Sequence, residues 1–290
     1  MANRAGAADA IAQATILEIY DPDRSQAVIN RTGRTQVASD WNRFTSAMSA
    51  TVDSLLSRQG QGLAILGEST SSLTTARLKA AVRKRFEKAE FFEYEPLSRD
   101  NEIAGAKLAL GRPARQVLHL NKAMVAVLLD ADPLGTHPAH VHYAYQWASN
   151  RPNSHGQMSR VYAIESLMSI SGSVADCRLG VRPSRIGSIL AALAARLGAG
   201  GNDLTLAEEE EAFVKHILAD IADNSGKGVV VVGPQHPPEL HAMALAVNDK
   251  IRAIGSTLTL VEEPDGDRAS HFDSIADLSS MLNYKQIDTL

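Results

Sequence analysis

The feature that most constrains the fold is a set of short, continuous apolar runs separated by helical patterns. Two of these runs, "VAVLL" (residues 125–129) and "VVVV" (residues 229–232), contain no polar residue. A strand that is apolar on both sides must be covered on both sides, which is the situation of a parallel sheet between helices. Strand–helix alternation also implies right-handed crossovers between parallel strands. The sequence therefore predicts an α/β fold in which one or more mostly parallel sheets are flanked by helices.

The predicted elements group into an arm and two lobes. A glycine-rich break, "GAGGND" (residues 198–203), separates the earlier strand–helix units from the later ones. We expect an N-terminal arm over residues 1–37, a first α/β lobe over 38–200 and a second over 201–290. The last segment, "QIDTL" (residues 286–290), reads as the opening of a strand. We therefore expect the second lobe to be cut off at its C-terminus, which predicts an exposed sheet edge and self-association.

Charge and cysteine content exclude several classes of protein. The formal net charge is −4, which gives no electrostatic basis for binding nucleic acid or an anionic membrane surface. No apolar run is long enough to insert into a bilayer, and no signal-peptide pattern is present, so the chain as written is expected in the cytoplasm. The single cysteine, Cys177, cannot form a disulfide within the chain or hold an iron–sulfur cluster. Its role is left open.

A group of acids and histidines follows the strand at residues 125–129. Because ligands of α/β proteins bind beyond the carboxyl ends of strands, Asp130 and Asp132 are candidate binding residues. His137, His140 and Asp132 offer a ligand set for a divalent metal. If residues 138–147 are helical, however, His140 and His142 point about 200° apart and cannot share an ion. We therefore expect no metal here.

The turn after the strand at residues 228–232 is a second candidate. Gly233 and His236 lie between a strand and a helix, where helix amides can face a phosphate. The further glycines of a dinucleotide fingerprint and the Gly-Lys-Ser/Thr of a Walker loop are missing. The cofactor-binding candidates, if there are any, are thus Asp130, Asp132, Gly233 and His236. The stretch at residues 166–184 is expected to be a glycine-bearing loop pressed against backbone.

Six stretches of the chain together resemble one family. The sequence is similar to the molybdopterin-oxidoreductase-like part of the iron–sulfur subunit of alternative complex III. Relatives are also labelled TAT-translocated molybdopterin oxidoreductases or iron–sulfur hydrogenase components. The resemblance runs from about Ala14 to Leu290. It rests on "ATILEIYDPDRSQ", "YEPLSRDNEIAGAKLALG", "VAVLLDADPLGTHP", "SLMSISGSVADCRLGVRPS", "HAMALAVNDKIRAIGSTL" and "SIADLSSMLNYKQIDTL".

The resemblance implies a Rossmann-like fold and a supporting role. In the family, a cluster-bearing, cysteine-rich domain follows this one, and the whole is exported to a membrane-associated, quinol-oxidising complex whose other subunits are partners. The domain itself is understood to carry no molybdenum and no redox centre. In true molybdopterin enzymes, the corresponding strand ends in a Gly-x-Asn-Pro-like turn that receives the guanine dinucleotide of the cofactor. This chain has "DADP" (Asp130 to Pro133) instead, which is a poor host for a pyrophosphate.

The leading hypothesis is therefore a cofactor-less scaffold with no catalytic residue of its own. Two alternatives stay open. One is a fragment of an oxidoreductase that binds molybdopterin guanine dinucleotide at the turns after Leu129 and Val232. The weaker alternative is a metal-dependent hydrolase that uses His137, His140 and Asp132. The scaffold hypothesis predicts that Asp132→Ala barely changes folding. Met124 and Cys177 depart from the family, whose members tend to have aspartate and histidine there.

Overall fold

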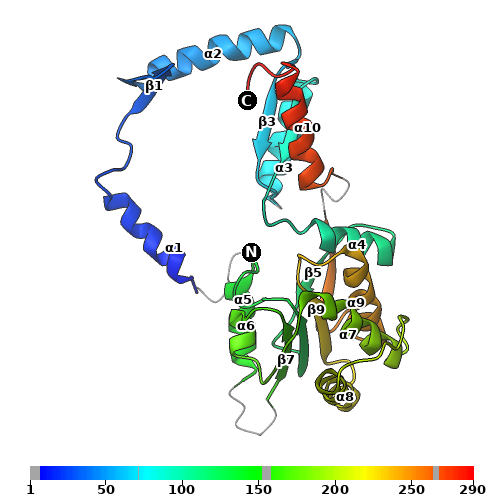
Figure 1. The fold of residues 1–290 in the computed structure, drawn as a ribbon. Coiled ribbons are helices and arrows are strands. Elements are labelled where there is room, and N and C mark those ends of the chain that lie inside the picture. Colours follow the sequence, from blue (N-terminus) through cyan, green and yellow to red (C-terminus); the bar gives the residue numbers. More distant parts are fainter. Residues whose placement is uncertain (1–6, 71, 152–157, 264–267) are drawn as a thin grey trace. The chain divides into compact units, whose positions relative to one another are not determined.

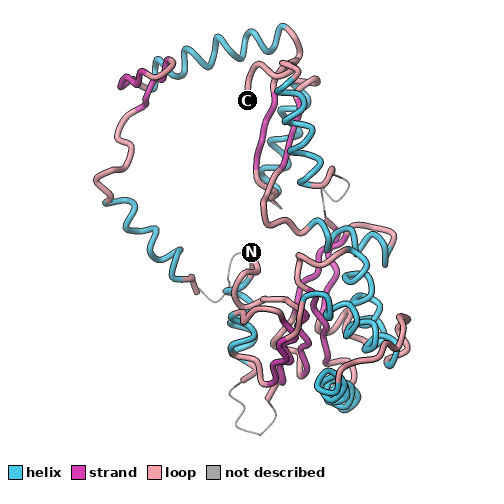
Figure 2. The backbone as a smooth tube through the Cα atoms, in the orientation of Figure 1, coloured by secondary structure: helices cyan, strands magenta, loops and turns pink. Residues whose placement is uncertain are grey.

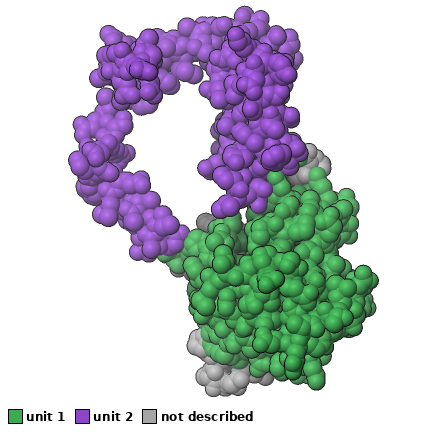
Figure 3. Space-filling view, viewed as in Figure 1, with its two compact units in different colours: residues 1–8, 99–268 green, residues 9–98, 269–290 purple. Residues whose placement is uncertain are grey.

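A computed structural model describes residues 7–70, 72–151, 158–263 and 268–290. The chain divides into two compact units (Figure 3). Unit 1 comprises Met1–Ala8 and Arg99–Arg268, and unit 2 comprises Asp9–Ser98 and Ala269–Leu290. Each unit is described by itself below.

Unit 1 is built on a four-stranded sheet in the order β8-β7-β6-β9 (Figures 1 and 2). All three strand pairs are parallel, and Val127 at the centre of β6 lies opposite Tyr162 of β7 and Val230 of β9. Every residue of β6 is buried, as its apolar sequence predicts. The strands are β6 (Val125–Leu129), β7 (Arg160–Glu165), β8 (Cys177–Gly180) and β9 (Gly228–Val232).

Helices cover both faces of this sheet. Figure 1 shows α5 and α6 on one side and α7 and α9 on the other. Pro183 begins α7, where its missing N–H is no loss. The predicted α/β fold with a parallel sheet flanked by helices is therefore confirmed. The helices are α4 (Asp100–Leu110), α5 (His140–Ser149), α6 (Ile170–Ser173), α7 (Pro183–Arg196), α8 (Glu208–Asp223) and α9 (Pro238–Lys250).

The outer edge of β9 is closed by a side chain. Asn248 of α9 is fully buried, and its amide makes two hydrogen bonds with the middle of the strand. Val230 N donates to Asn248 Oδ1 over 2.8 Å, and Asn248 Nδ2 donates to the Val230 carbonyl over 2.7 Å. The amide thus takes the place of a further strand at this position. A separate antiparallel pair, β5 (Ala114–Leu118) with β10 (Leu258–Glu262), completes the strands of unit 1.

The units divide the chain differently from the expected lobes. The boundary expected between residues 200 and 201 lies inside unit 1, because β9 pairs with β6 in the same sheet. Residues 38–98, expected in the first lobe, belong to unit 2 together with the C-terminal helix. The stretch at residues 166–184 is also more ordered than a loop, because it contains α6 and β8.

Unit 2 has a much smaller core. The parallel strands β3 (Ala64–Gly67) and β4 (Glu90–Glu93) pack with α10 (His271–Asn283) around a cluster of Ala64, Phe92 and Leu278. Helix α3 (Leu73–Arg85) has no buried residue and is joined to β4 by the ion pair of Lys79 with Glu93. The segment expected to open a strand pairs beside β3. Ala64 N donates to the Thr289 carbonyl over 2.9 Å, and Leu63 and Thr289 form an isolated parallel bridge.

The N-terminal part of unit 2 lies mostly in solvent. It contains α1 (Ala10–Ala14), a 3-10 helix η1 (Thr15–Tyr20), the antiparallel hairpin β1 (Val28–Thr32) with β2 (Thr35–Ser39), and α2 (Trp41–Ser57). Asp40 caps α2, since Arg43 N donates to its Oδ1 over 2.9 Å. Among the described helices of both units, none combines the length and apolar character needed to cross a bilayer.

Candidate functional site

The loops that follow β6, β7 and β9 meet at the carboxyl edge of the parallel sheet, where α/β proteins bind ligands. Asp130 has a φ of +48°, in the left-handed region that favours glycine. Its Oδ1 accepts from Ser166 N over 2.7 Å, and its Oδ2 lies 3.1 Å from His236 Nε2. The side chains of His236 and Asp130 are only 9% and 6% exposed. Asp130, Ser166, Gly233, Gln235 and His236 are called the Asp130 cluster below.

Gly233 fits tightly in this cluster. A Cβ at this position would lie 2.1 Å from the Asp130 carbonyl oxygen and 2.6 Å from Gln235 Oε1. Gln235 Nε2 in turn donates to the Asp130 carbonyl over 2.9 Å. The structure therefore brings together three of the four cofactor-binding candidates, Asp130, Gly233 and His236. It also fills the space beside the glycine with protein atoms.

The Asp130 cluster contains serine, aspartate and histidine, but in the wrong order for a hydrolytic triad. Ser166 Oγ lies 3.2 Å from Asp130 Oδ1, and the imidazole contacts the opposite carboxylate oxygen. In a triad, the imidazole lies between the hydroxyl and the carboxylate, so that it can take the hydroxyl proton. Here the carboxylate lies between the other two, so the arrangement positions a loop and does not activate Ser166.

Asp132, the fourth candidate, is hydrogen-bonded to Ser171 of α6, the short helix after β7. Its Oδ1 accepts from Ser171 N over 2.9 Å and from Ser171 Oγ over 2.6 Å, and its Oδ2 accepts from Thr136 N over 3.1 Å. Ser171 Oγ also accepts from Leu134 N over 3.0 Å. Oδ1 thus joins the loop after β6 to α6, and Oδ2 stabilises a turn within its own loop.

The structure does not arrange His137, His140 and Asp132 as a metal site. His137 Nδ1 accepts from Ala139 N over 2.9 Å, and His140 Nδ1 lies 3.0 Å from the His137 carbonyl at the start of α5. His142 Nε2 instead contacts Gln146 over 2.9 Å. Among the described residues, no group of three or more His, Cys, Asp or Glu side chains could hold a metal ion.

A third carboxylate at this edge was not predicted from the sequence. Glu165, the last residue of β7, is 2% exposed. Its Oε1 accepts from Arg178 Nε over 2.6 Å, and its Oε2 accepts from Ser169 Oγ over 2.7 Å. A Cβ at Gly172 would lie 1.9 Å from Glu165 Oε1, so only glycine fits beside it. The signal was an acid that directly follows the mostly apolar run "VYAI" (residues 161–164).

A second cluster of polar side chains, Arg99, Glu102, His137 and His241, lies near α4 and α9. Arg99 makes a bidentate pair with Glu102, at 2.9 and 2.6 Å. Burial, followed by the positive charge of Arg99, lowers the pKa of His137 to about 4. Burial also lowers the pKa of His241, which is 1% exposed and whose Nε2 lacks a hydrogen-bond partner among the described atoms. The buried position of these two histidines was not predicted from the sequence. A Cβ at Gly105 of α4 would lie 2.4 Å from His241 Cβ, so the two helices are in close contact.

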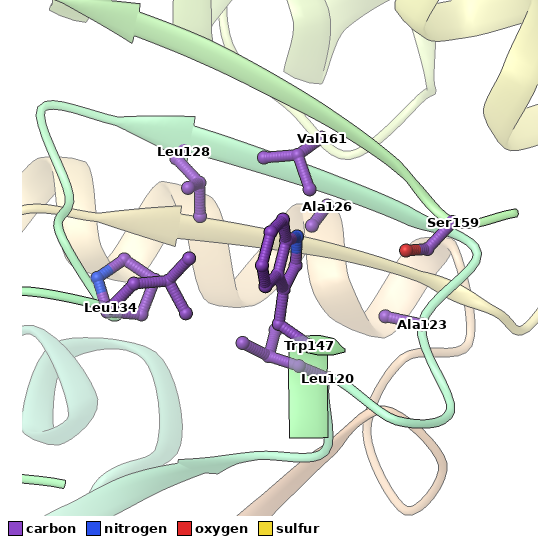
Figure 4. Close-up of a pocket in the computed structure, with 9 residues that line it drawn as sticks. Leu120, Ala123, Ala126, Leu128, Leu134, Trp147, Ser159 and Val161 are labelled. Atoms are coloured by element: carbon purple, nitrogen blue, oxygen red, sulfur yellow. The ribbon is translucent and has the colours of Figure 1, made fainter. Parts of the chain in front are cut away.

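One small cavity lies beside β6 (Figure 4). Its volume is about 10 Å³, close to the space of a single water molecule and far below that of a nucleotide. Ala126, Leu128 and Val161 line it, together with the ring of Trp147.

Cys177 is half-buried on β8, and burial raises the pKa of its thiol, which disfavours the reactive thiolate.

The fold is similar to that of a known enzyme. No family model and no curated protein matches the chain. Among solved structures, the chain is similar to acetylene hydratase from Pelobacter acetylenicus, with a TM-score of 0.51 and 8% identity over 82% of this chain and 37% of that one. A second similarity is to the formyltransferase/hydrolase complex (FhcABCD) from Methylorubrum extorquens in complex with methylofuran, with a TM-score of 0.47 and 17% identity over 79% and 58% of the two chains. The chain thus spans less than two thirds of either neighbour.

Proposed function

We propose that this chain is a cofactor-less, molybdopterin-oxidoreductase-like scaffold of a membrane-associated, quinol-oxidising electron-transfer complex. The observation that carries the proposal is that the carboxylates at the carboxyl edge of the sheet are hydrogen-bonded within the chain. Asp130, Asp132 and Glu165 place three carboxylates there, and each is engaged by hydrogen bonds within the chain. At the sheet edge where an α/β enzyme would bind its ligand, these carboxylates hold neighbouring segments of the chain together.

A molybdopterin guanine dinucleotide does not fit these residues. Its pyrophosphate would need close backbone approach and free amide donors. Gln235 and the Asp130 carbonyl fill the space beside Gly233. Pro237 and Pro238, at the start of α9, carry no N–H to donate. The nearby carboxylates would also repel an anion, so we assign no step of a reaction to this cofactor.

The scaffold role places the redox chemistry outside this chain. One cysteine cannot hold an iron–sulfur cluster, which usually needs four thiolates. We therefore propose that a cluster-bearing domain and other subunits of the complex are the partners, as the family resemblance suggests. Catalytic residues are not assigned. The fold shared with acetylene hydratase supports the architecture of this proposal but not the specific complex.

The test is a nucleotide and metal inventory of the purified chain. We expect neither molybdenum nor tungsten by elemental analysis, and no guanine nucleotide released on denaturation. Added GMP or GDP should leave the melting temperature unchanged, because only a ligand that binds the native state stabilises it. Near-stoichiometric metal or nucleotide, or a shift of several degrees, would overturn the proposal in favour of a cofactor-binding fragment.

If GMP or GDP did shift the melting temperature, the site where the nucleotide binds would have to be located. His236→Gln keeps a side-chain donor for Asp130 and removes the imidazole. A nucleotide bound at the carboxyl edge should lose affinity in this variant. His216→Gln, on the exposed side of α8, is the matched control and should bind as the wild type does.

A further inference from the structure

Helix α3 is strongly basic, although the whole chain carries a formal net charge of −4. Its 13 residues include five Lys or Arg side chains and no Asp or Glu. The nearest acids along the chain, Glu68 and Glu87, lie outside the helix. Most arginines of unit 1, by contrast, pair with carboxylates, as Arg115 does with Glu263. The net charge of the chain therefore conceals a local excess of positive charge at α3.

The contacts of α3 with β4 define the inner side of the helix. Lys79 forms an ion pair with Glu93, and the Arg83 guanidinium lies 4.8 Å from the centre of the Phe91 ring. Phe92, between these two residues of β4, belongs to the cluster that α10 covers. Since successive residues of a strand point to opposite faces of the sheet, α3 and α10 lie on opposite faces of the β3–β4 pair. The acidic side chains of α10 are thus across the sheet from α3.

The outer side of α3 combines basic and apolar side chains. At about 100° per residue, Arg77, Lys84 and Arg85 point to the half of the helix opposite β4. All three are exposed, and among the described residues no carboxylate lies within ion-pair distance of them. Leu73 and Leu78 lie on the same half and are 82% and 55% exposed. These five residues, called the outer side of α3 below, present three unpaired cations together with two exposed leucines.

We propose that the outer side of α3 is a docking surface for an anionic lipid bilayer. A helix with basic residues and leucines on one side lies in the plane of the bilayer surface, where its cations meet lipid head groups and its apolar side chains enter the acyl boundary. The attraction to anionic lipid acts within about a Debye length, roughly 8 Å. Because its range is so short, the local charge of α3 decides it. The expectation drawn from the net charge of −4 therefore does not apply to this helix.

Shape and side-chain type favour a bilayer over other anions. The outer side of a single helix is convex, so it can meet a broad surface but cannot enclose a small phosphate. Surfaces that bind nucleic acid typically add amide, hydroxyl or aromatic side chains. Apart from Thr74, the outer half of α3 carries only basic and apolar residues. Exposed leucines gain free energy on transfer from water into an apolar layer, which a bilayer supplies.

Binding to a bilayer through α3 does not depend on the proposed scaffold role. A chain that released a guanine nucleotide could still bind vesicles through α3, and a cofactor-free chain could fail to bind them. Vesicle binding and the cofactor inventory are therefore separate measurements, and either one can fail without the other.

The test is flotation of the full chain with lipid vesicles. We expect binding to phosphatidylcholine vesicles that contain about one quarter phosphatidylserine, and none to phosphatidylcholine alone. Binding should weaken strongly as salt rises from about 0.1 M to 1 M, because salt screens the attraction. Arg77→Glu combined with Lys84→Glu should weaken partitioning at least about 25-fold, since each basic residue contributes a factor of about five. Leu73→Ser should weaken it several-fold without a change in charge.

Arg31→Glu combined with Arg34→Glu is the matched control, because it reverses two exposed cations of the same unit outside α3. It should bind vesicles as the wild type does, and circular dichroism should show that all variants are folded. Equal binding to neutral vesicles, or equal affinity of the two double variants, overturns the proposal. So does binding of polyglutamate or double-stranded DNA without binding of vesicles, which would identify an acidic protein or a nucleic acid as the partner. Wild-type binding by Leu73→Ser would overturn the entry of this side chain into the bilayer.

Discussion

At the scale of single residues, the carboxylates at the carboxyl edge hold loops together, and this changes what a mutation at Asp132 should do. The sequence suggested that Asp132→Ala would be nearly neutral. In the structure, the Asp132 carboxylate accepts three hydrogen bonds, from Ser171 N, Ser171 Oγ and Thr136 N. Leaving such donors without a partner costs about 1–3 kcal/mol. We therefore expect Asp132→Ala to lower the free energy of unfolding by that amount in urea titrations.

Two variants sharpen this measurement. Asp132→Asn keeps an oxygen that can accept from Ser171, so its loss should be smaller than that of Asp132→Ala. Asp223→Ala, on the exposed end of α8, removes an acid that the described contacts do not use, and it should change stability by less than about 0.5 kcal/mol. Equal stability of Asp132→Ala and the wild type would show that these hydrogen bonds contribute nothing net.

His137 should make stability depend on pH. Its pKa is about 4 in the folded chain against an ordinary value of 6.5. Between these values, the unfolded chain binds a proton that the folded chain does not, so the contribution is fully present above pH 6.5 and is lost as the pH falls toward 4. From pH 7 to pH 5, we expect a loss of about 2 kcal/mol from this group. The lowered pKa of His241 acts in the same direction.

His137→Asn isolates this effect, because the asparagine oxygen can still accept from Ala139 N while nothing titrates. Unfolding of unit 1 can be followed by Trp147 fluorescence in a Trp41→Phe background, since the chain has two tryptophans. The variant should lose less stability between pH 7 and pH 5 than the wild type. His216→Asn, on the exposed side of α8, should keep the full pH dependence. An unchanged slope in His137→Asn would contradict the assignment.

At the scale of elements, the sheet edge at β9 is closed by Asn248, and the fold should depend on that amide. Asn248→Leu leaves the Val230 N–H and carbonyl without their partners in a buried place. Because each unsatisfied buried group costs about 1–3 kcal/mol, we expect a loss of at least about 2 kcal/mol in the free energy of unfolding. The neighbouring exposed Asp249→Leu should be close to neutral. Comparable stability of the two variants would show that the strand edge does not need the amide.

The elements that the sequence predicted are the ones whose burial is uniform. β6 and β9 are apolar along their whole length, so the two-sided burial of a parallel strand can be read directly from them. β8 was missed because it is four residues long, alternates in burial and ends in Gly180. The β5–β10 pair was also not predicted as a pair, since its partners are antiparallel and far apart in sequence.

The contacts within the candidate site could not be predicted from the sequence either. Asp130 and His236 were each identified from their positions after a strand, but they are 106 residues apart in sequence. Their pairing depends on β6 and β9 being neighbours, which no local pattern encodes. Glu165 was overlooked for a related reason, because its partner Arg178 lies on β8, the missed strand. Strand-end positions could thus be predicted from sequence, whereas the contacts between them required the strand order.

At the scale of the whole molecule, the two units differ greatly in core size, and their stabilities should differ as well. Unit 1 buries a large continuous cluster around β6, β7 and β9, whereas the separate cluster of unit 2 consists of Ala64, Phe92 and Leu278. Because stability is not uniform across a structure, we expect unit 2 to open at lower free energy than unit 1. Amide hydrogen exchange should therefore be slowest in β6, β7 and β9 and faster in β3, β4 and α10.

Phe92→Ala tests whether the units open independently. Truncating a buried phenylalanine typically costs about 3–5 kcal/mol, which a core this small can ill sustain. Exchange measured by mass spectrometry should then become fast in β3, β4 and α10 and stay slow in β6, β7 and β9. Val214→Ala, at a fully buried position of α8 in unit 1, is the reciprocal variant and should speed exchange in unit 1 without a matching change in α10. If Phe92→Ala raised exchange equally in both units, the chain would unfold as one cooperative body.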